Sequence, residues 1–251
     1  RCSGGGEVWS RGMSVGSRQY EHKKHWVFRQ DLFTRHQQHG LRMSAVAEYS
    51  ATEASMAKLI SDTICKYVDA RTATITDGTA CMGSNVVPFA LAFKRVNAVE
   101  IDPQQYQDLE YNIRDIMHCL HVKLWNMDIT SKRALSSLQH DVLYLAPPWG
   151  GVHYRDVKHL QLFLSGMRLA DVCAQWAVHT RFLALKLPVN FDFRDFRAGV
   201  KRPYTEVFCE YLGYDSAQNA CVLSEHENRH TRHKPLMVFM ILQSDNPSRG
   251  A

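Results

Sequence analysis

The residues best suited to chemistry are a proline pair and an aromatic, Pro147-Pro148-Trp149, which end an apolar run over residues 142–145 and precede two glycines. Prolines remove backbone donors and fix φ, so a strand stops here and the turn presents outward-facing carbonyl oxygens. These oxygens can accept hydrogen bonds from an exocyclic amine while the indole stacks on its ring. The pattern predicts a site for a planar base, with Pro147, Pro148 and Trp149 as catalytic residues. The alternative is an ordinary proline-glycine loop with a surface tryptophan.

Acidic residues follow three other apolar runs. Asp77 opens a turn of small residues, where backbone can approach a ligand at a helix N-terminus. Glu100 can accept from both hydroxyls of a ribose, and Asp128 can accept from an adenine amine. An adenosine-bearing ligand beside an amine-binding turn indicates S-adenosylmethionine, whereas a nicotinamide cofactor is disfavoured because Gly-x-Gly-x-x-Gly is absent. The predicted cofactor-binding residues are Asp77, Thr79, Gly83, Asn85, Glu100, Asp128 and Ala146.

Alternating strands and helices must position these residues. The β-branched and apolar runs predict seven strands, at 72–76, 96–101, 122–125, 142–145, 182–187, 205–212 and 236–242. Helices are predicted after the turn at 77–85, from the Asp102-Pro103 cap to about His118, over 131–138 and over 160–177. This order predicts an α/β fold with a doubly wound, mostly parallel, seven-stranded sheet. Ligands then bind at the carboxyl ends of its strands.

The composition divides the chain into three predicted parts. Residues 1–20 are rich in Gly, Ser and Arg and predict a flexible segment. Residues 21–70 predict a helical extension, in which cations such as Lys24 interleave with aromatics such as Trp26. The cations form either a solvated face or a contact with RNA. Within it, Ser50-x-x-Glu53 has the form of a capping box, which predicts a helix to about Val68. The catalytic domain is predicted over 71–251.

Charge and cysteine usage narrow the class of protein. The net charge of +5 and the pI near 8.8 mildly favour a polyanionic partner. No apolar run approaches the ~20 residues that span a bilayer, so we expect no membrane partner. The seven cysteines are dispersed without a Cys-x-x-Cys pair, as expected of reduced intracellular thiols. His226, His230 and His233 have ligand-like spacing, but the cations among them would repel a metal, and we expect none.

At these motifs the chain resembles a known family. Residues 146–151, Ala-Pro-Pro-Trp-Gly-Gly, are similar to the Ser-Pro-Pro-Trp-Gly-Gly motif of the trimethylguanosine synthases, which methylate the guanine N2 of 7-methylguanosine RNA caps. Residues 99–103 are similar to their Ile-Asp-Ile-Asp-Pro, and residues 77–85 to their Asp-x-Phe-Cys-Gly-x-Gly-Gly-Asn turn. Similarity to their amino-terminal extension begins near residue 23, and the whole resemblance ends near residue 190.

The resemblance implies a class I methyltransferase fold and an RNA substrate, either a capped small RNA or ribosomal RNA, with Trp149 stacked on a methylated guanine. The predicted substrate-binding residues are Trp149, Tyr154, Lys186, Asn190, Lys24 and Trp26. The family implies the nucleus or nucleolus, whereas an Arg1 start left by processing of a targeting segment would indicate the mitochondrion.

The chain also departs from the family motifs. Cys81 replaces their first close-approach glycine, Thr79 a phenylalanine, Ser84 a glycine, Ala146 the serine before the prolines, and Val189 an arginine suited to phosphates. Two alternatives stay open. One is a catalytically degenerate protein that serves as an RNA-bound or ribonucleoprotein assembly factor, for example of the mitochondrial ribosome. The other is an adenine-N6 methyltransferase, against which Ala146 counts.

Overall fold

The computed structural model describes residues 40–44, 47, 50–200, 203–215, 220–224 and 233–245. The segment predicted to be flexible at 1–20, residues 21–39 of the predicted extension with Lys24 and Trp26, and the histidines His226 and His230 lie outside these residues. Within the described ranges, no helix is both long and apolar enough to cross a bilayer.

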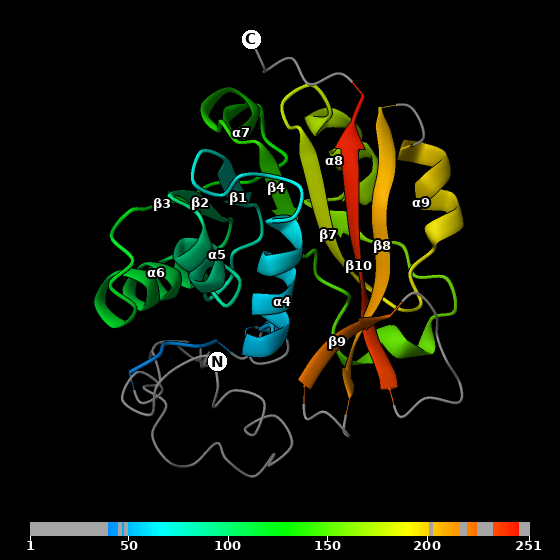
Figure 1. Ribbon diagram of the computed structural model, residues 1–251, viewed down its shortest axis with the longest axis horizontal. Coiled ribbons are helices and arrows are strands. Elements are labelled where there is room, and N and C mark those ends of the chain that lie inside the picture. The colour runs from blue at the N-terminus through cyan, green and yellow to red at the C-terminus, as the bar shows by residue number, and fades with distance from the viewer. Residues whose placement is uncertain are drawn as a thin grey trace, which may run out of the picture.

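One sheet organises the molecule, with strand order β3-β2-β1-β4-β7-β10-β8-β9 (Figure 1). Its five strands from β3 to β7 run parallel, and β10, β8 and β9 continue it antiparallel. The strands are β1 Thr74–Asp77, β2 Arg95–Glu100, β3 Val122–Asn126, β4 Val142–Leu145, β7 Phe182–Pro188, β8 Tyr204–Asp215, β9 Ala220–Ser224 and β10 His233–Ser244. The mostly parallel, doubly wound fold is confirmed. The predicted count of seven strands is wrong, because β9 pairs with β8 as an eighth.

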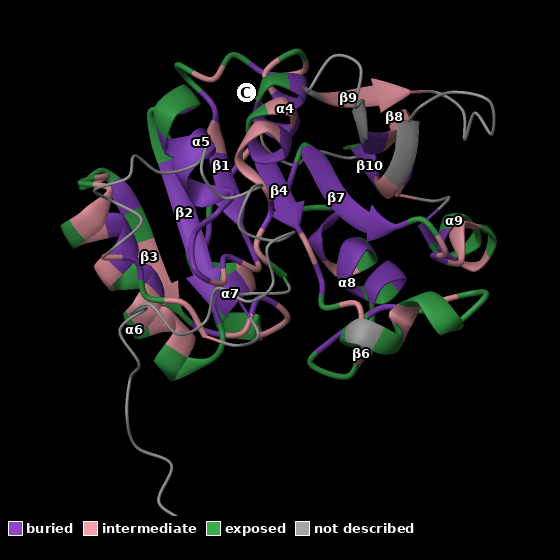
Figure 2. Cartoon of the chain, turned by 90° about the horizontal axis from the view of Figure 1, so that it is seen from below, coloured by how far each residue is buried: buried purple, intermediate pink, exposed green. Residues whose placement is uncertain are grey.

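Helices cover both faces of the sheet. One hydrophobic cluster joins α4 (Ala54–Ile64), α5 (Val86–Ala92) and α6 (Pro103–Tyr111) to the sheet, and the other joins α7 (Lys132–Ser137), α8 (Leu169–Trp176) and α9 (Phe193–Val200). Side chains alternate between the faces, so on β4 Val142 and Tyr144 face α4 while Leu143 and Leu145 face α8. The central strands form a buried layer between the helices (Figure 2). Burial on both faces explains their near-continuous apolar runs.

Caps fix where the helices begin. Asp102 caps α6 by accepting a hydrogen bond from the Gln105 amide at 2.8 Å, and Pro103 is the first residue of the helix, as predicted. The predicted capping box at Ser50 is wrong. Glu53 is the N-cap of α4, and its carboxylate accepts from the Ser55 and Met56 amides. The chain from Ser50 to Glu53 is instead drawn inward by a hydrogen bond from the Thr52 amide to Ser84 Oγ.

One predicted helix ends earlier than expected, and another ends close to its predicted boundary. α4 stops at Ile64 rather than near Val68, because the amides of Lys66 and Tyr67 bond three residues back and tighten the last turn. α6 ends at Tyr111 and widens into a π-helical turn over Asn112–Ile116. The left-handed φ of 54° at His118 then prevents the helical segment from continuing, near the predicted boundary.

The predicted helix over 160–177 is half wrong. Its first part forms a hairpin of β5 (Phe163–Leu164) and β6 (Met167–Arg168), and only Leu169–Trp176 is helical, as α8. The hairpin turn has positive φ at both central residues, 49° at Ser165 and 80° at Gly166. This is the two-residue turn that matches the twist of paired strands, and glycine makes it accessible. Helix α9 was not predicted.

Candidate active site

The predicted cofactor residues lie along one edge of the sheet. β1, β2, β3 and β4 are adjacent and parallel, so their carboxyl ends lie at the same edge. Asp77 and Glu100 are the last residues of β1 and β2, Asp128 follows β3 by two positions, and Pro147 follows β4 by two. The structure therefore brings an acidic row together with the proline turn.

Asp77 lies fully buried at the centre of this edge. Its Oδ1 accepts from the Thr79 amide at 3.0 Å, whereas its Oδ2 has no hydrogen-bond partner among the described residues. Burial raises the pKa of this carboxyl to about 7, and the ammonium of Lys186 opposes that rise. A buried acceptor without a donor is costly, so the Asp77 oxygen is suited to a ligand that brings one.

The loop after β1 is tied to the proline turn. Thr79 Oγ1 accepts from the Ala146 amide at 2.7 Å, which joins the end of β1 to the residue before Pro147. Gly83 has a φ of +99°, which favours glycine, and a Cβ there would lie 3.1 Å from Leu109 Cδ1, so that side chain would have to shift. The loop therefore supports the proline turn, and its small residues leave its backbone open to a ligand.

Glu100 is held by the backbone. Its two oxygens accept from the amides of Cys81 and Asp102, each at 2.9 Å. Burial raises the pKa of this carboxyl, and the two amides counter the rise. Each carboxylate oxygen can accept more than one bond, so Glu100 is fixed in place and can still accept from ribose hydroxyls.

Asp128 is half-buried beyond the end of β3. Its Oδ1 accepts from both the amide and the hydroxyl of Thr130 at 2.8 Å. Met127 and Ile129 on either side of it are buried. A carboxylate between apolar side chains suits the edge of an adenine ring, as the sequence predicts.

Trp149 lies at the carboxyl edge of β4 and not in the core. Its side chain is half-buried, and its ring meets that of Tyr154 edge-on with centroids 5.1 Å apart. Pro147 is buried and Pro148 is exposed. The sequence thus places an aromatic pair, Trp149 with Tyr154, next to the carbonyls of the proline turn.

Asn190 holds this aromatic pair in position. Its Nδ2 donates to the carbonyls of Tyr154 and Val157, at 2.7 and 2.6 Å, and so fixes the short turn Val152–Asp156 against the end of β7. Tyr154 extends its hydroxyl toward Arg155, whose Nε donates to it at 3.1 Å. Asn190, a predicted substrate residue, therefore uses its amide group to position the loop. Tyr154, also a predicted substrate residue, packs against Trp149, and we refer to this aromatic pair as the base platform.

Lys186 lies inside the site, on β7. The side chain is buried, and its Nζ donates to Thr52 Oγ1 at 2.6 Å. The same nitrogen lies 5.9 Å from the centroid of the Trp149 ring. Burial lowers the pKa of Lys186 to about 8, an effect that Asp77 opposes. The ammonium thus faces the protein interior and is not directed at solvent, where RNA phosphates would lie.

Thr52 and Tyr144 were missed as site residues. Thr52 Oγ1 accepts from Asn85 Nδ2 at 2.9 Å as well as from Lys186, so it links the predicted extension to two predicted site residues. Its place within the stretch similar to the family's extension was the available signal. Tyr144 is fully buried on β4, close to Asp77 and Thr52, and only its membership of an apolar run was visible.

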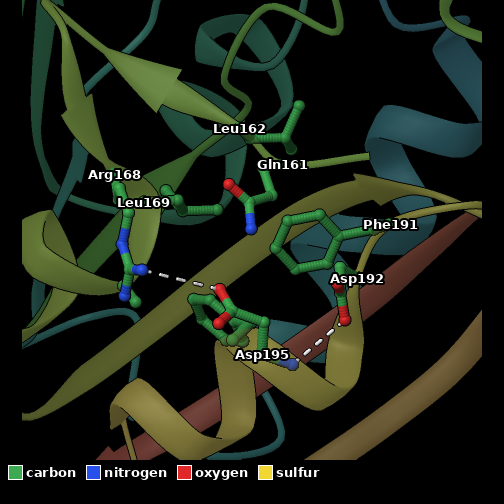
Figure 3. A pocket seen from close by; sticks show the side chains of 9 residues that line it. Gln161, Leu162, Arg168, Leu169, Phe191, Asp192 and Asp195 are labelled. Atoms are coloured by element: carbon green, nitrogen blue, oxygen red, sulfur yellow. Dashed lines mark hydrogen bonds and ion pairs between the residues drawn. The ribbon is translucent and has the colours of Figure 1, made fainter. Parts of the chain in front are cut away.

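A hollow in the surface lies apart from the carboxyl ends of β1 to β4. It lies between the β5–β6 hairpin and α9, where Arg168 approaches Asp195 at 3.9 Å (Figure 3). Arg168 and Asp195 therefore pair with each other, and Asp192 accepts from the Asp195 amide at 3.0 Å. Outside the hollow, Arg168 also approaches Asp171 at 3.5 Å. Across the described ranges, no group of three or more His, Cys, Asp or Glu side chains is arranged to hold a metal ion.

Comparison with known proteins decides the family. Residues 72–228 match the model of the family described as RNA cap guanine-N2 methyltransferase. The chain belongs to this family. Its sheet is the Rossmann-like sheet of class I methyltransferases, and S-adenosylmethionine is the cofactor. The acidic row and the orphaned Asp77 oxygen fit that molecule, which would lie across Asp77, Glu100 and Asp128.

Curated relatives match this chain in part. It is 34% identical over 122 residues to the uncharacterized protein L320 of Acanthamoeba polyphaga mimivirus, which is 47% of either chain. It is 22% identical over 186 residues to the trimethylguanosine synthase of Saccharomyces cerevisiae, which is 71% of this chain and 58% of the yeast protein. The chain therefore spans about half the length of these relatives.

Solved structures agree on the fold. A candidate RNA methyltransferase of Pyrococcus horikoshii superposes with a TM-score of 0.52 at 13% identity, over 77% of this chain and 85% of that one. The precorrin-6y C5,15-methyltransferase of Geobacter metallireducens gives a TM-score of 0.51 at 12% identity, over 81% and 94%. At such identities the likeness shows the fold alone.

Proposed function

We propose that this chain transfers a methyl group from S-adenosylmethionine to the N2 amine of a guanine in RNA. The observation that carries the proposal is the hydrogen bond from the Ala146 amide to Thr79 Oγ1. It joins the cofactor cradle after β1 to the proline turn after β4. The acceptor base on Trp149 and the methyl donor beside Asp77 therefore share one rigid support.

The residues at this edge act mainly by alignment. The N2 amine is a poor nucleophile because its lone pair is delocalised into the guanine ring, so its orientation toward the donor decides the rate. The carbonyls of the proline turn accept from the amine, and the Trp149 face fixes the plane of the base. S-adenosylmethionine supplies an electrophilic methyl group. No strong general base is needed at the site.

Product analysis tests the proposed reaction. The chain is incubated with isotopically labelled S-adenosylmethionine and RNA, the RNA is digested, and the labelled nucleoside is identified by mass spectrometry. We expect label in N2-methylated guanine. Label in N6-methyladenine would replace the proposal with the adenine reaction, and an RNA that acquires no label would contradict both.

Trp149→Ala tests the base platform. Stacking of a base on an aromatic contributes ~1–3 kcal/mol, so RNA affinity should fall by about that much. The half-buried indole lies at an edge, so the free energy of unfolding should change far less than the ~3–5 kcal/mol typical of a core tryptophan. RNA titrations and urea unfolding on the same samples measure both. Unchanged RNA affinity would remove Trp149 from the site.

A second candidate is an RNA-bound scaffold that no longer transfers methyl groups. It is favoured by Cys81, whose φ of 49° places a side chain in a backbone region that glycine prefers, inside the cofactor cradle. Titration calorimetry with S-adenosylmethionine separates the candidates. Absence of binding, together with retained RNA binding, would favour the scaffold.

A further inference from the structure

Asn112 joins two segments that are far apart in the sequence. It is the first residue of the π-helical turn after α6, and only 1% of the residue is exposed. Its Oδ1 accepts from the Arg42 amide at 2.9 Å, and its Nδ2 donates to the Arg42 carbonyl at 2.8 Å. The same Nδ2 donates to the Met82 carbonyl at 3.1 Å. One buried carboxamide therefore holds the backbone of residue 42 and the loop after β1 together.

Met82 lies in the part of that loop where the backbone is left-handed. The residues on either side of it, Cys81 and Gly83, have φ values of 49° and 99°. A strained conformation of this kind persists only where the surrounding structure holds it. The Cys81 amide donates to Glu100 at 2.9 Å, so the same backbone supports a predicted ribose acceptor. The bond from Asn112 to Met82 therefore bears on the shape of the predicted cofactor site.

The π-helical turn also supports the loop by packing. A Cβ at Gly83 would lie 3.0 Å from Ile113 Cδ1 and 3.1 Å from Leu109 Cδ1, so these side chains pack directly against the loop. Wide turns of this kind are frequent at functional sites. Here the turn directs Asn112 and Ile113 at two consecutive residues of the loop, Met82 and Gly83.

Residues 40–44 are irregular backbone beside the end of α6 (Figure 1). Leu41 is buried in the hydrophobic cluster that also contains Met82. Arg42 is exposed, and its guanidinium carbon lies 3.8 Å from the centroid of the Tyr111 ring. Irregular segments at the surface belong to the parts of a protein that open at low free energy, so the docking of this segment can respond to a ligand.

We infer that Asn112 is a positioning residue that couples the docking of residues 41–43 to the binding of S-adenosylmethionine. The docked segment favours the loop conformation that binds the cofactor, and the bound cofactor favours the docked segment. The two effects are equal in size, because coupling between two equilibria is reciprocal. The coupling involves the cofactor alone, whichever base of the RNA is methylated.

Hydrogen exchange tests the coupling in the wild-type chain. Amide exchange over residues 41–43 is followed by mass spectrometry with and without saturating S-adenosylhomocysteine, after calorimetry has shown that the nucleoside binds. We expect the bound nucleoside to slow this exchange on the order of tenfold. Unchanged exchange over these residues would overturn the inference, and so would absence of binding.

Matched variants assign the coupling to this contact. Asn112→Leu keeps the approximate volume of the side chain and removes all three hydrogen bonds. Affinity for S-adenosylhomocysteine should fall on the order of tenfold, and the ligand-dependent slowing over residues 41–43 should vanish. Arg42→Ala leaves Asn112 in place and should weaken the same binding about threefold, because it removes the contact with Tyr111. Arg95→Ala, exposed at the opposite end of β2 from Glu100, is the control and should bind like the wild type.

A purely structural role for Asn112 gives a different result. It would lower the free energy of unfolding of Asn112→Leu in urea, while exchange over residues 41–43 in the wild type would not respond to the ligand. If Asn112→Leu does not fold, Arg42→Ala and the exchange of the wild type still decide. Equal affinity of Arg42→Ala and Arg95→Ala for S-adenosylhomocysteine would overturn the inference.

Discussion

At the scale of single residues, the site is defined by groups whose partners come from other strands or loops. The Glu100 carboxylate accepts a hydrogen bond from the Cys81 amide, and the Thr79 hydroxyl accepts one from the Ala146 amide. The Lys186 ammonium donates a hydrogen bond to the Thr52 hydroxyl. Each of these bonds crosses from one chain segment to another. Individual substitutions should therefore affect ligand binding and local backbone geometry separately, and the two effects can be measured apart.

Glu100→Ala should weaken S-adenosylmethionine binding by ~1.5–3 kcal/mol, the usual contribution of hydrogen bonds to a charged group. Titration calorimetry measures the change. Glu110→Ala, on the exposed side of α6, is the control and should bind like the wild type. Equal affinity in both variants would remove Glu100 from the cofactor site.

Cys81 should behave as a position made for glycine. Its φ of 49° is left-handed, where a Cβ costs about 1–2 kcal/mol. Cys81→Gly and Cys81→Ala lose the same thiol, so comparing them isolates the backbone. We expect the glycine variant to have the higher free energy of unfolding by about 1 kcal/mol, measured by urea denaturation. A more stable alanine variant would show that the backbone relaxes at this position.

At the scale of elements, the candidate base site is formed by short connections that strands and helices hold in place. The turn Val152–Asp156 presents Tyr154 to Trp149, yet the residue that fixes it, Asn190, lies beyond the end of β7. The geometry of the base platform therefore depends on a contact between two loops 36 positions apart in sequence.

Asn190→Ala should loosen that turn without unfolding the sheet. It removes two donors from the carbonyls of Tyr154 and Val157, which costs about 1–3 kcal/mol. RNA affinity should fall, and amide exchange over residues 152–157 should speed up. Val189→Ala, at the preceding exposed position, is the control. If exchange in the turn is the same in both variants, Asn190 does not position Tyr154.

The sequence predicted elements best where local and long-range requirements agree. Residues 142–145 were predicted with their observed bounds, because a strand buried on both faces is apolar at every position. Residues 160–168 were not, because the predicted helix was extended backward from α8, although Leu160, Leu162 and Leu164 alternate as in a strand and Ser165-Gly166 forms the turn of the hairpin. Thr52 was missed because its partner Lys186 is 134 positions away.

At the scale of the whole molecule, the buried charge at Lys186 links stability to pH. The folded protein lowers the pKa of this lysine from 10.5 to about 8, so between these values the unfolded chain binds a proton that the folded one has lost. The contribution of Lys186 to the free energy of unfolding therefore rises with pH across this window and is flat below it.

Urea denaturation of the wild type and of Lys186→Met over this range measures that contribution. The difference between them, wild type minus variant, should increase by on the order of 2–4 kcal/mol from about pH 8 to about pH 10.5. Only the difference is informative, since Cys173, Cys209 and Cys221 have raised pKa values and act in the opposite direction in both proteins. A constant difference would show that the ammonium is solvated in the folded state.

The packing of α4 also bears on how the molecule assembles. The helix carries Thr52 just before its cap, and it is anchored to β9 by hydrogen bonds among Ser55, Glu53 and the thiol of Cys221. These partners are 166 and 168 positions apart, a separation typical of high contact order and slow folding. During synthesis from the amino end, Thr52, which accepts from Lys186, is anchored in this way only after the antiparallel strands have emerged. A nascent chain that already contains β1 to β7 would therefore still lack the contacts with Cys221 that hold the beginning of α4.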